Sequence, residues 1–140
     1  MIRRANYRDL ESINIIGREL HDNFDYLFKM ENVLNTSYSR VYLYEEDGKV
    51  LGFIHVDSHF EIMDLINIVV LKEYQGKGIG NKLLEFVVNN EEYEKIMLEV
   101  RESNSTAIHL YEKFGFKEIY RRKKYYGEED AVIMERMKEC

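Results

Sequence analysis

The chain has 140 residues, 45% of them hydrophobic and 33% charged, and its formal net charge is −6 at pH 7. This length supports one hydrophobic core but not two domains of ordinary size, so we expect a single domain over residues 1–140. The acidic balance argues against a nucleic-acid-binding protein and is compatible with a basic peptide or an amine as the partner.

The first half of the chain predicts a strand, two helices and a hairpin. Gly17 lies on the apolar face of the first predicted helix, where a neighbouring segment can approach closely. Asp47-Gly48, between two β-rich runs, is a strong hairpin signal. The helical pattern weakens over residues 22–39, where we expect one shorter helix in a partly irregular connection. The predicted elements are a strand in 1–6, helices in 9–21 and 22–39, and strands in 41–44 and 50–56.

The second half predicts strands that alternate with two helices and end in a hairpin. Alternate residues of a strand share a face, so Glu99 lies on the face opposite Leu98 and Val100. Gly115 ends the second helix of this half. The predicted elements are a strand in 62–71, a helix in 77–90, a strand in 95–101, a helix in 105–114, and strands in 116–126 and 131–137.

Three glycines, Gly76, Gly78 and Gly80, lie between the buried strand and the following helix. Glycines leave room for an approaching ligand, and the free N–H groups of a helix's first turn favour a phosphate or pyrophosphate. The residues after Gly80 are Asn81-Lys82-Leu83, which lack the Gly-Lys-Ser/Thr of a nucleoside-triphosphate loop and the third glycine of a dinucleotide fingerprint. The pattern therefore predicts an anion site of another kind.

The same turn resembles the central motif of the GNAT acyl-CoA N-acetyltransferases, Gln/Arg-x-x-Gly-x-Gly/Ala, which Gln75-Gly76-Lys77-Gly78-Ile79-Gly80 satisfies. The predicted order of elements also matches that fold, a mixed α/β (α+β) architecture with a mostly antiparallel central sheet flanked by helices. The resemblance implies acetyl-CoA as the donor, with its pyrophosphate on the turn amides and its acetyl end along the strand. The donor-binding residues that it implies are Ile68, Val69, Val70, Gln75, Gly76, Lys77, Gly78, Ile79, Gly80, Asn81 and Asn104.

A second, more specific motif follows in the next strand and helix. Leu98-Glu99-Val100-Arg101-x-Ser103-Asn104 and then Ala107-Ile108-x-Leu110-Tyr111-x-x-x-Gly115-Phe116 resemble the RimI branch, the peptide N-terminal (alanine) acetyltransferases. The run Arg121-Arg122-Lys123-Lys124-Tyr125-Tyr126 and the segment Glu129-Asp130-Ala131-Val132-Ile133-Met134 resemble the same branch.

Acetyl transfer to an amine needs a base, because an α-amino group with a pKa of about 8 is mostly protonated at neutral pH. Glu99 is a carboxylate in an otherwise apolar strand, and desolvation would raise its pKa and suit it to accept that proton, directly or through a water. A half-buried glutamate paired with a lysine or arginine explains the pattern equally well. The resemblance favours the base, because the family places its base at this glutamate.

A phenol can protonate the departing thiolate. Spacing alone makes Tyr111 a core residue of its helix, whereas the resemblance assigns it as the general acid. An unpaired strand N–H near Ile68, Val69 and Val70 would stabilise the developing oxyanion. Ser103 or Asn104 can cap the helix that follows, and the resemblance also assigns Asn104 to holding the donor, a role compatible with capping.

Other polar residues predict no metal site. The four histidines, His21, His55, His59 and His109, lack metal-ligand spacing and are predicted to be structural or surface residues. Cys140 is the single cysteine, which excludes an internal disulfide. The basic run at residues 121–124 is either a solvated strand face or a contact to the 3′-phosphate of the donor or to the acceptor.

The compartment and the acceptor are predicted less directly. No apolar run is long enough to cross a bilayer, and the first residues lack the apolar part of a secretory signal, so we expect a cytoplasmic protein that is not associated with a membrane. The resemblance implies that the acceptor is the N-terminus of a protein or peptide, with a ribosomal protein as one candidate. A small-molecule amine such as a polyamine or aminoglycoside, and a non-catalytic acyl-CoA-binding module, remain alternatives. The Pro-Trp pair expected near the second helix is replaced by Asn23-Phe24-Asp25-Tyr26, which leaves ribosomal protein S18 open as the acceptor, and the oligomeric state is open too.

Overall fold

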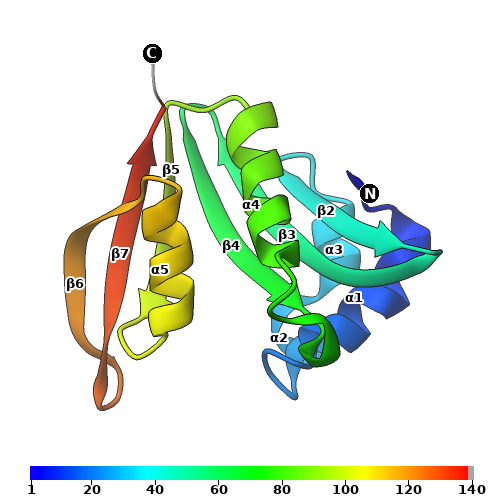
Figure 1. Cartoon of the computed structure of the whole chain (residues 1–140), viewed down its shortest axis with the longest axis horizontal. Helices are drawn as coiled ribbons and strands as arrows, with labels where there is room; N and C mark the ends of the chain where they lie inside the picture. The colour runs from blue at the N-terminus through cyan, green and yellow to red at the C-terminus, as the bar shows by residue number, and fades with distance from the viewer. Residues whose placement is uncertain (139–140) are drawn as a thin grey trace. The chain divides into compact units, whose positions relative to one another are not determined.

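The computed structural model describes residues 1–138, which fall into two compact units (Figure 1). Unit 1 comprises Met1–Ser58 and Leu65–Glu91, and unit 2 comprises His59–Asp64 and the residues from Glu92 onward. A single domain over the whole chain stays a prediction, and Cys140 lies outside the described residues.

The described residues form seven strands in one mixed sheet, in the order β1-β2-β3-β4-β5-β7-β6. Neighbouring strands are antiparallel in the pairs β1–β2, β2–β3, β5–β7 and β6–β7, and β4 is parallel to β5, as expected of the predicted mixed, mostly antiparallel sheet. The strands are β1 (Ile2–Arg4), β2 (Ser39–Glu46), β3 (Lys49–His59), β4 (Ile62–Val70), β5 (Lys95–Arg101), β6 (Lys117–Tyr126) and β7 (Glu129–Met137).

Five α-helices and two short 3-10 segments complete the described chain. The helices are α1 (Leu10–Gly17), α2 (Phe24–Phe28), α3 (Met30–Leu34), α4 (Ile79–Asn90) and α5 (Ser105–Lys113), and the 3-10 segments are η1 (Tyr7–Asp9) and η2 (Lys72–Tyr74). The strand and helix order therefore follows the predicted one except before β2.

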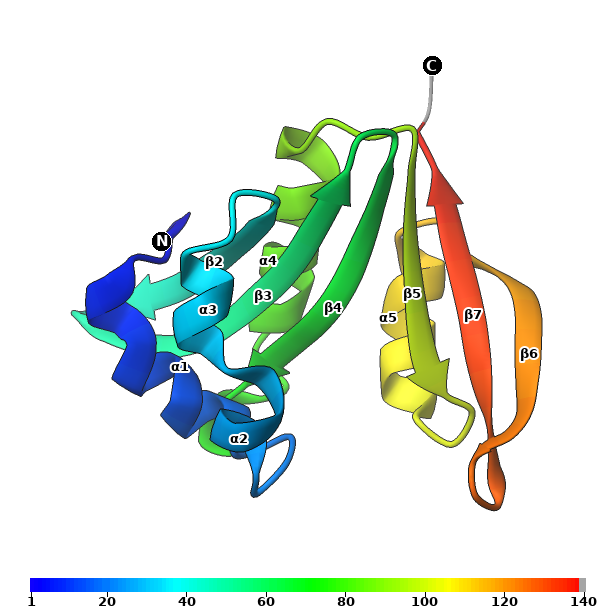
Figure 2. The ribbon, with the colours of Figure 1, turned by 180° about the vertical axis from the view of Figure 1, so that it is seen from behind.

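In unit 1 the sheet has helices on both faces, with α1, α2 and α3 on one and α4 on the other (Figures 1 and 2). Buried residues of α1, α2, α3, β2 and β3 form a hydrophobic core with the end of β4. On the α4 face, the Tyr42 and Phe86 rings lie 4.9 Å apart. The predicted close approach at Gly17 is confirmed, because a Cβ at this position would lie 2.3 Å from the Phe24 ring.

Unit 2 contains β5, β7 and β6 with the first residues of β4, and α5 covers one face of these strands (Figures 1 and 2). The pairing of β4 with β5 runs from Ile62–Lys95 to Asp64–Met97. Leu98 and Val100 of β5 are buried and Glu99 is exposed, which confirms the predicted alternation. The buried side chains of β5 therefore face α5, and Glu99 faces away from that helix.

Two local predictions were wrong. Residues 22–39 hold two short helices rather than one, because Lys29 adopts a left-handed conformation with φ of 44° and ends α2 before α3 begins. The helix after the glycine turn begins at Ile79 rather than at residue 77, because Gly78 has a positive φ angle that a helix cannot include.

Candidate active site

The glycine turn before α4 is built by main-chain conformation. Gly76 and Gly78 have φ angles of 80° and 83°, and a Cβ placed on either would meet no atom within 4 Å. Gly78 is the N-cap of the twelve-residue helix α4, and no side chain caps this end. An open, left-handed glycine turn at an uncapped helix N-terminus fits an anion such as a pyrophosphate.

Neighbouring residues fix this turn to the end of β4. The side-chain amide of Gln75 donates to the Val70 carbonyl over 3.0 Å, and the Leu71 amide donates to the Leu51 carbonyl of β3 over 2.9 Å. The Lys77 ammonium lies 5.4 Å from the centre of the Tyr74 ring. Unit 1 thus brings together the predicted donor-binding residues on β4, the turn and α4: Ile68, Val69, Val70, Gln75, Gly76, Lys77, Gly78, Ile79, Gly80 and Asn81.

Unit 2 carries the proposed base, Glu99, on the open face of β5. The expected desolvation is not met in the described chain, because Glu99 is exposed, with its side chain about 30% accessible. Its carboxylate instead has two polar neighbours. The Tyr126 hydroxyl donates to Glu99 Oε2 over 3.0 Å, and Arg122 Nε lies 3.7 Å from Oε1.

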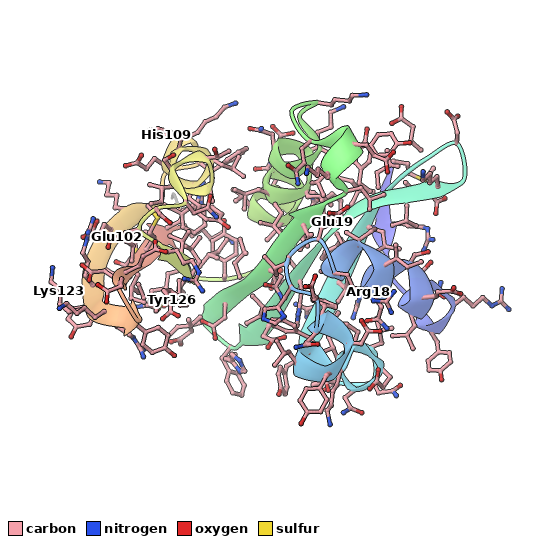
Figure 3. All side chains as sticks on the ribbon, turned by 90° about the horizontal axis from the view of Figure 1, so that it is seen from below. Arg18, Glu19, Glu102, His109, Lys123 and Tyr126 are labelled. Carbon is pink, nitrogen blue, oxygen red and sulfur yellow. The ribbon has the colours of Figure 1, made fainter. Side chains whose placement is uncertain are left out.

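No role was predicted from the sequence for either of these two neighbours. Tyr126 and Arg122 belong to the basic and aromatic run that resembles the RimI branch, so the signal was present without a role attached to it. Glu99 and Tyr126 are 27 residues apart, and only the strand register brings them into contact. Tyr126 is labelled on the β6–β7 hairpin in Figure 3.

Tyr111, the proposed acid, is buried on α5 with 6% of its surface exposed. Its ring lies 5.7 Å from that of Phe116. Burial raises the pKa of Tyr111 to about 12. The phenol is therefore protonated at neutral pH, as a proton donor must be.

The remaining predicted polar residues have structural partners. Asn104 caps α5 by accepting from the Ala107 amide over 3.2 Å, which confirms its capping role and leaves its contact with the donor a prediction. Arg121 pairs with Glu118 at 2.8 Å and with Glu102 at 3.1 Å, as on a solvated strand face. Lys123 pairs with Asp130 at 3.2 Å.

No group of three or more potential metal ligands is found among the described residues. His55 is buried in β3, where its Nε2 lies 2.9 Å from Asp57 Oδ1, and burial lowers its pKa. No helix in residues 1–138 is both long and apolar enough to cross a membrane.

Comparison with known proteins identifies the class of this fold. A family model described as an acetyltransferase (GNAT) domain matches residues 37–118. An N-alpha-acetyltransferase of Sulfurisphaera tokodaii is 36% identical over 95% of this chain and 90% of its own length. The ribosomal protein bS18-alanine N-acetyltransferase of Escherichia coli K12 is 41% identical over 98 residues, which are 64% of this chain and 65% of that protein.

A crystal structure of the ribosomal-protein-S18-alanine N-acetyltransferase from Escherichia coli has the same fold. It aligns with a TM-score of 0.89 and 29% identity over 100% of this chain and 94% of that one. The fold and the matches therefore define an acyltransferase. The chain belongs to the GNAT acetyltransferase family and is similar to RimI, as the two sequence motifs predicted.

Proposed function

We propose that this enzyme transfers an acetyl group from acetyl-CoA to the N-terminal α-amine of a protein or peptide, as a single GNAT domain. The observation that carries this proposal is the match to an N-alpha-acetyltransferase over 95% of the chain. The open glycine turn supports the choice of donor, because it fits a pyrophosphate. A cytoplasmic location accompanies the proposal, since the N-termini of newly made and ribosomal proteins are found there.

On the donor side, the main-chain amides of residues 76–81 hold the pyrophosphate, and Gln75 holds the turn against β4. Main-chain N–H groups around Ile68, Val69 and Val70 donate hydrogen bonds at the acetyl end, and Asn104 contributes at the start of α5. The bound thioester supplies the activated acetyl group. No step in this scheme uses a metal.

On the acceptor side, Glu99 accepts the proton of the incoming ammonium, directly or through a water. Its exposure lets an amine or a water reach the carboxylate. Tyr111 gives its proton to the departing sulfur, and at neutral pH the phenol is protonated, as this step requires. As the tetrahedral intermediate collapses, the nitrogen loses its second proton, which returns to the ionised Tyr111 directly or through water. The cycle then ends with one net proton on Glu99, which passes to the solvent.

A free-thiol release assay with acetyl-CoA tests the function. The acceptors are short peptides varied at the first two residues, including the ribosomal protein S18 N-terminus, beside polyamines and aminoglycosides. We expect thiol release with a subset of peptides and none with α-acetylated copies of them. Release with polyamines or aminoglycosides alone would establish the small-molecule alternative, and no release with any acceptor despite acetyl-CoA binding would favour the non-catalytic module.

A further inference from the structure

The strand register places a group of polar side chains on the same face of unit 2 as Glu99. Arg101 of β5 is opposite Ala131 of β7, which is opposite Arg122 of β6, and Glu99 is two residues before Arg101. Residues directly opposite one another in neighbouring antiparallel strands share a face. Glu99, Arg101 and Arg122 therefore project from one side, away from α5.

A local irregularity in β6 brings Tyr126 to this face. The β6–β7 register shifts between Arg122 and Tyr126, and Lys124 within this stretch has a φ of 51°. Bulges of this kind re-aim the side chain that follows them. Beyond the shift, Tyr126 is opposite Glu129, two residues before Ala131 on β7, so its side chain projects from the Glu99 side.

Tyr126 is held by a contact to its ring as well as by the hydrogen bond of its hydroxyl. The Arg101 guanidinium lies 4.1 Å from the centre of the Tyr126 ring, close enough for a cation–π contact. Arg101 in turn lies 3.5 Å from Glu129, which also accepts from the Ser103 amide over 3.1 Å. A tyrosine held in this way can fix the position of the carboxylate that its hydroxyl contacts.

The hydrogen bond from Tyr126 makes the two oxygens of the Glu99 carboxylate different from each other. Oε2 accepts from the phenol at 3.0 Å, whereas Oε1 has Arg122 Nε at 3.7 Å, beyond hydrogen-bond distance. Oε1 is therefore the oxygen left to accept a proton. Burial and the Glu99 carboxylate raise the pKa of Tyr126, which keeps the phenol neutral and able to donate.

We propose that Tyr126 is a positioning residue for the reaction: held by Arg101, it fixes the Glu99 carboxylate through Oε2 and presents Oε1 to the amine. This inference rests on the proposed function, in which Glu99 is the base. Tyr126 itself neither gains nor loses a proton in the reaction. Loss of its hydroxyl leaves Glu99 in place but lets the carboxylate rotate.

The Tyr126→Phe variant tests this role, because it removes the hydroxyl and keeps the ring on Arg101. We expect kcat to fall about tenfold, the value of one hydrogen bond, with the KM for acetyl-CoA unchanged. Tyr125→Phe is the matched control, because the two rings are neighbours 5.2 Å apart, and we expect it to keep the wild-type kcat. A Tyr126→Phe enzyme with wild-type kcat would overturn the inference.

A double variant separates positioning from a general structural role. If Tyr126 acts through Glu99, Glu99→Gln with Tyr126→Phe is no slower than Glu99→Gln alone. If the fold-losses in rate of the two single variants multiply in the double variant, Tyr126 acts independently of Glu99, and the inference is overturned. Loss of rate in Glu99→Gln with none in Tyr126→Phe contradicts this inference alone, whereas full activity of Glu99→Gln contradicts the proposed base as well.

A crystal structure of the Tyr126→Phe variant provides a readout that needs no acceptor. We expect the Glu99 side chain to occupy more than one rotamer once its hydrogen bond is removed, while the backbone of β5 and β6 stays in place. A Glu99 side chain that keeps its single wild-type rotamer would contradict the positioning role.

Discussion

The glycine turn of unit 1 offers main-chain groups, whereas the Glu99 face of unit 2, formed by Glu99, Arg101, Arg122 and Tyr126, offers side chains. The turn is a contiguous stretch of main chain, residues 75–81, and what its glycines contribute is the absence of a side chain. The Glu99 face collects side chains from β5 and β6, and its central contact joins residues 27 positions apart. A main-chain site follows from a local pattern, whereas a side-chain site depends on how strands pair.

The difference also predicts how each region fails. Substitution in the turn obstructs a ligand and acts on affinity, because the amides remain whatever the side chain is. Under the proposed mechanism, substitution of Glu99 removes the group that accepts a proton and therefore acts on rate. Separate measurements of donor affinity and turnover therefore test whether the two regions have the roles proposed for them.

The largest effect is expected for Glu99→Gln, which keeps the shape of the side chain and removes its basicity. We expect kcat at neutral pH to fall by about 10²- to 10⁴-fold, with acetyl-CoA affinity nearly unchanged, as measured by thiol release and calorimetry. Glu112→Gln, at an exposed glutamate of α5, is the control and should keep the wild-type kcat and acetyl-CoA affinity. Equal turnover by wild type and Glu99→Gln would remove Glu99 from the mechanism.

Tyr111→Phe should lower kcat by about 10- to 100-fold. The effect is smaller than that of Glu99→Gln because a thiol has a pKa of about 8.5, so a thiolate needs less help from an acid to leave than an alkoxide does. Tyr120→Phe, at a tyrosine of β6 that is 63% exposed, is the control and should retain wild-type turnover. If Tyr111→Phe turns over at the wild-type rate, Tyr111 is a core residue only.

The stability of the protein at alkaline pH provides an independent check on Tyr111. The raised pKa of about 12 exceeds the ordinary tyrosine value of about 10. Between these two pH values the folded state therefore holds a proton that the unfolded state has lost. Its contribution, about 2 to 3 kcal/mol, is present below pH 10 and is lost between pH 10 and 12. Denaturant unfolding of wild type and Tyr111→Phe at both ends of this window should show a smaller pH-dependent loss for the variant.

Gly78→Val should weaken coenzyme A binding at least about tenfold, because the branched side chain enters the open space beside the α4 amides. The substitution also strains a backbone with φ of 83°, so a control with the same strain is needed. Gly48, in the β2–β3 turn, has φ of 76° and equally open surroundings. Calorimetry should show weak binding for Gly78→Val and wild-type binding for Gly48→Val, and unaltered affinity in both would discard the turn as the pyrophosphate site.

Much of the fold was predictable because its signals are local. Asp47-Gly48 predicted the first hairpin, the alternation in β5 predicted its buried face, and the candidate caps Ser103 and Asn104 predicted the start of α5, where Asn104 is the cap. The break at Lys29 was not predictable, because no local sequence signal marks a lysine for a left-handed conformation. The flanking helices α2 and α3 nevertheless bury Phe24 and Met30 in the same core. The partners of Glu99 were not predictable for a related reason, since they depend on a register shift in β6.

The smallest effect concerns Asn104, where capping and donor binding make different predictions. Asn104→Ala loses the bond to the Ala107 amide and should lower the free energy of unfolding by about 1 kcal/mol. Asn104→Ser retains a capping oxygen but loses the amide donors that could contact acetyl-CoA. Weaker acetyl-CoA binding in the stably folded Asn104→Ser variant would show that Asn104 holds the donor. If Asn104→Ser binds acetyl-CoA as the wild type does, Asn104 serves unit 2 as a helix cap and should be removed from the donor site.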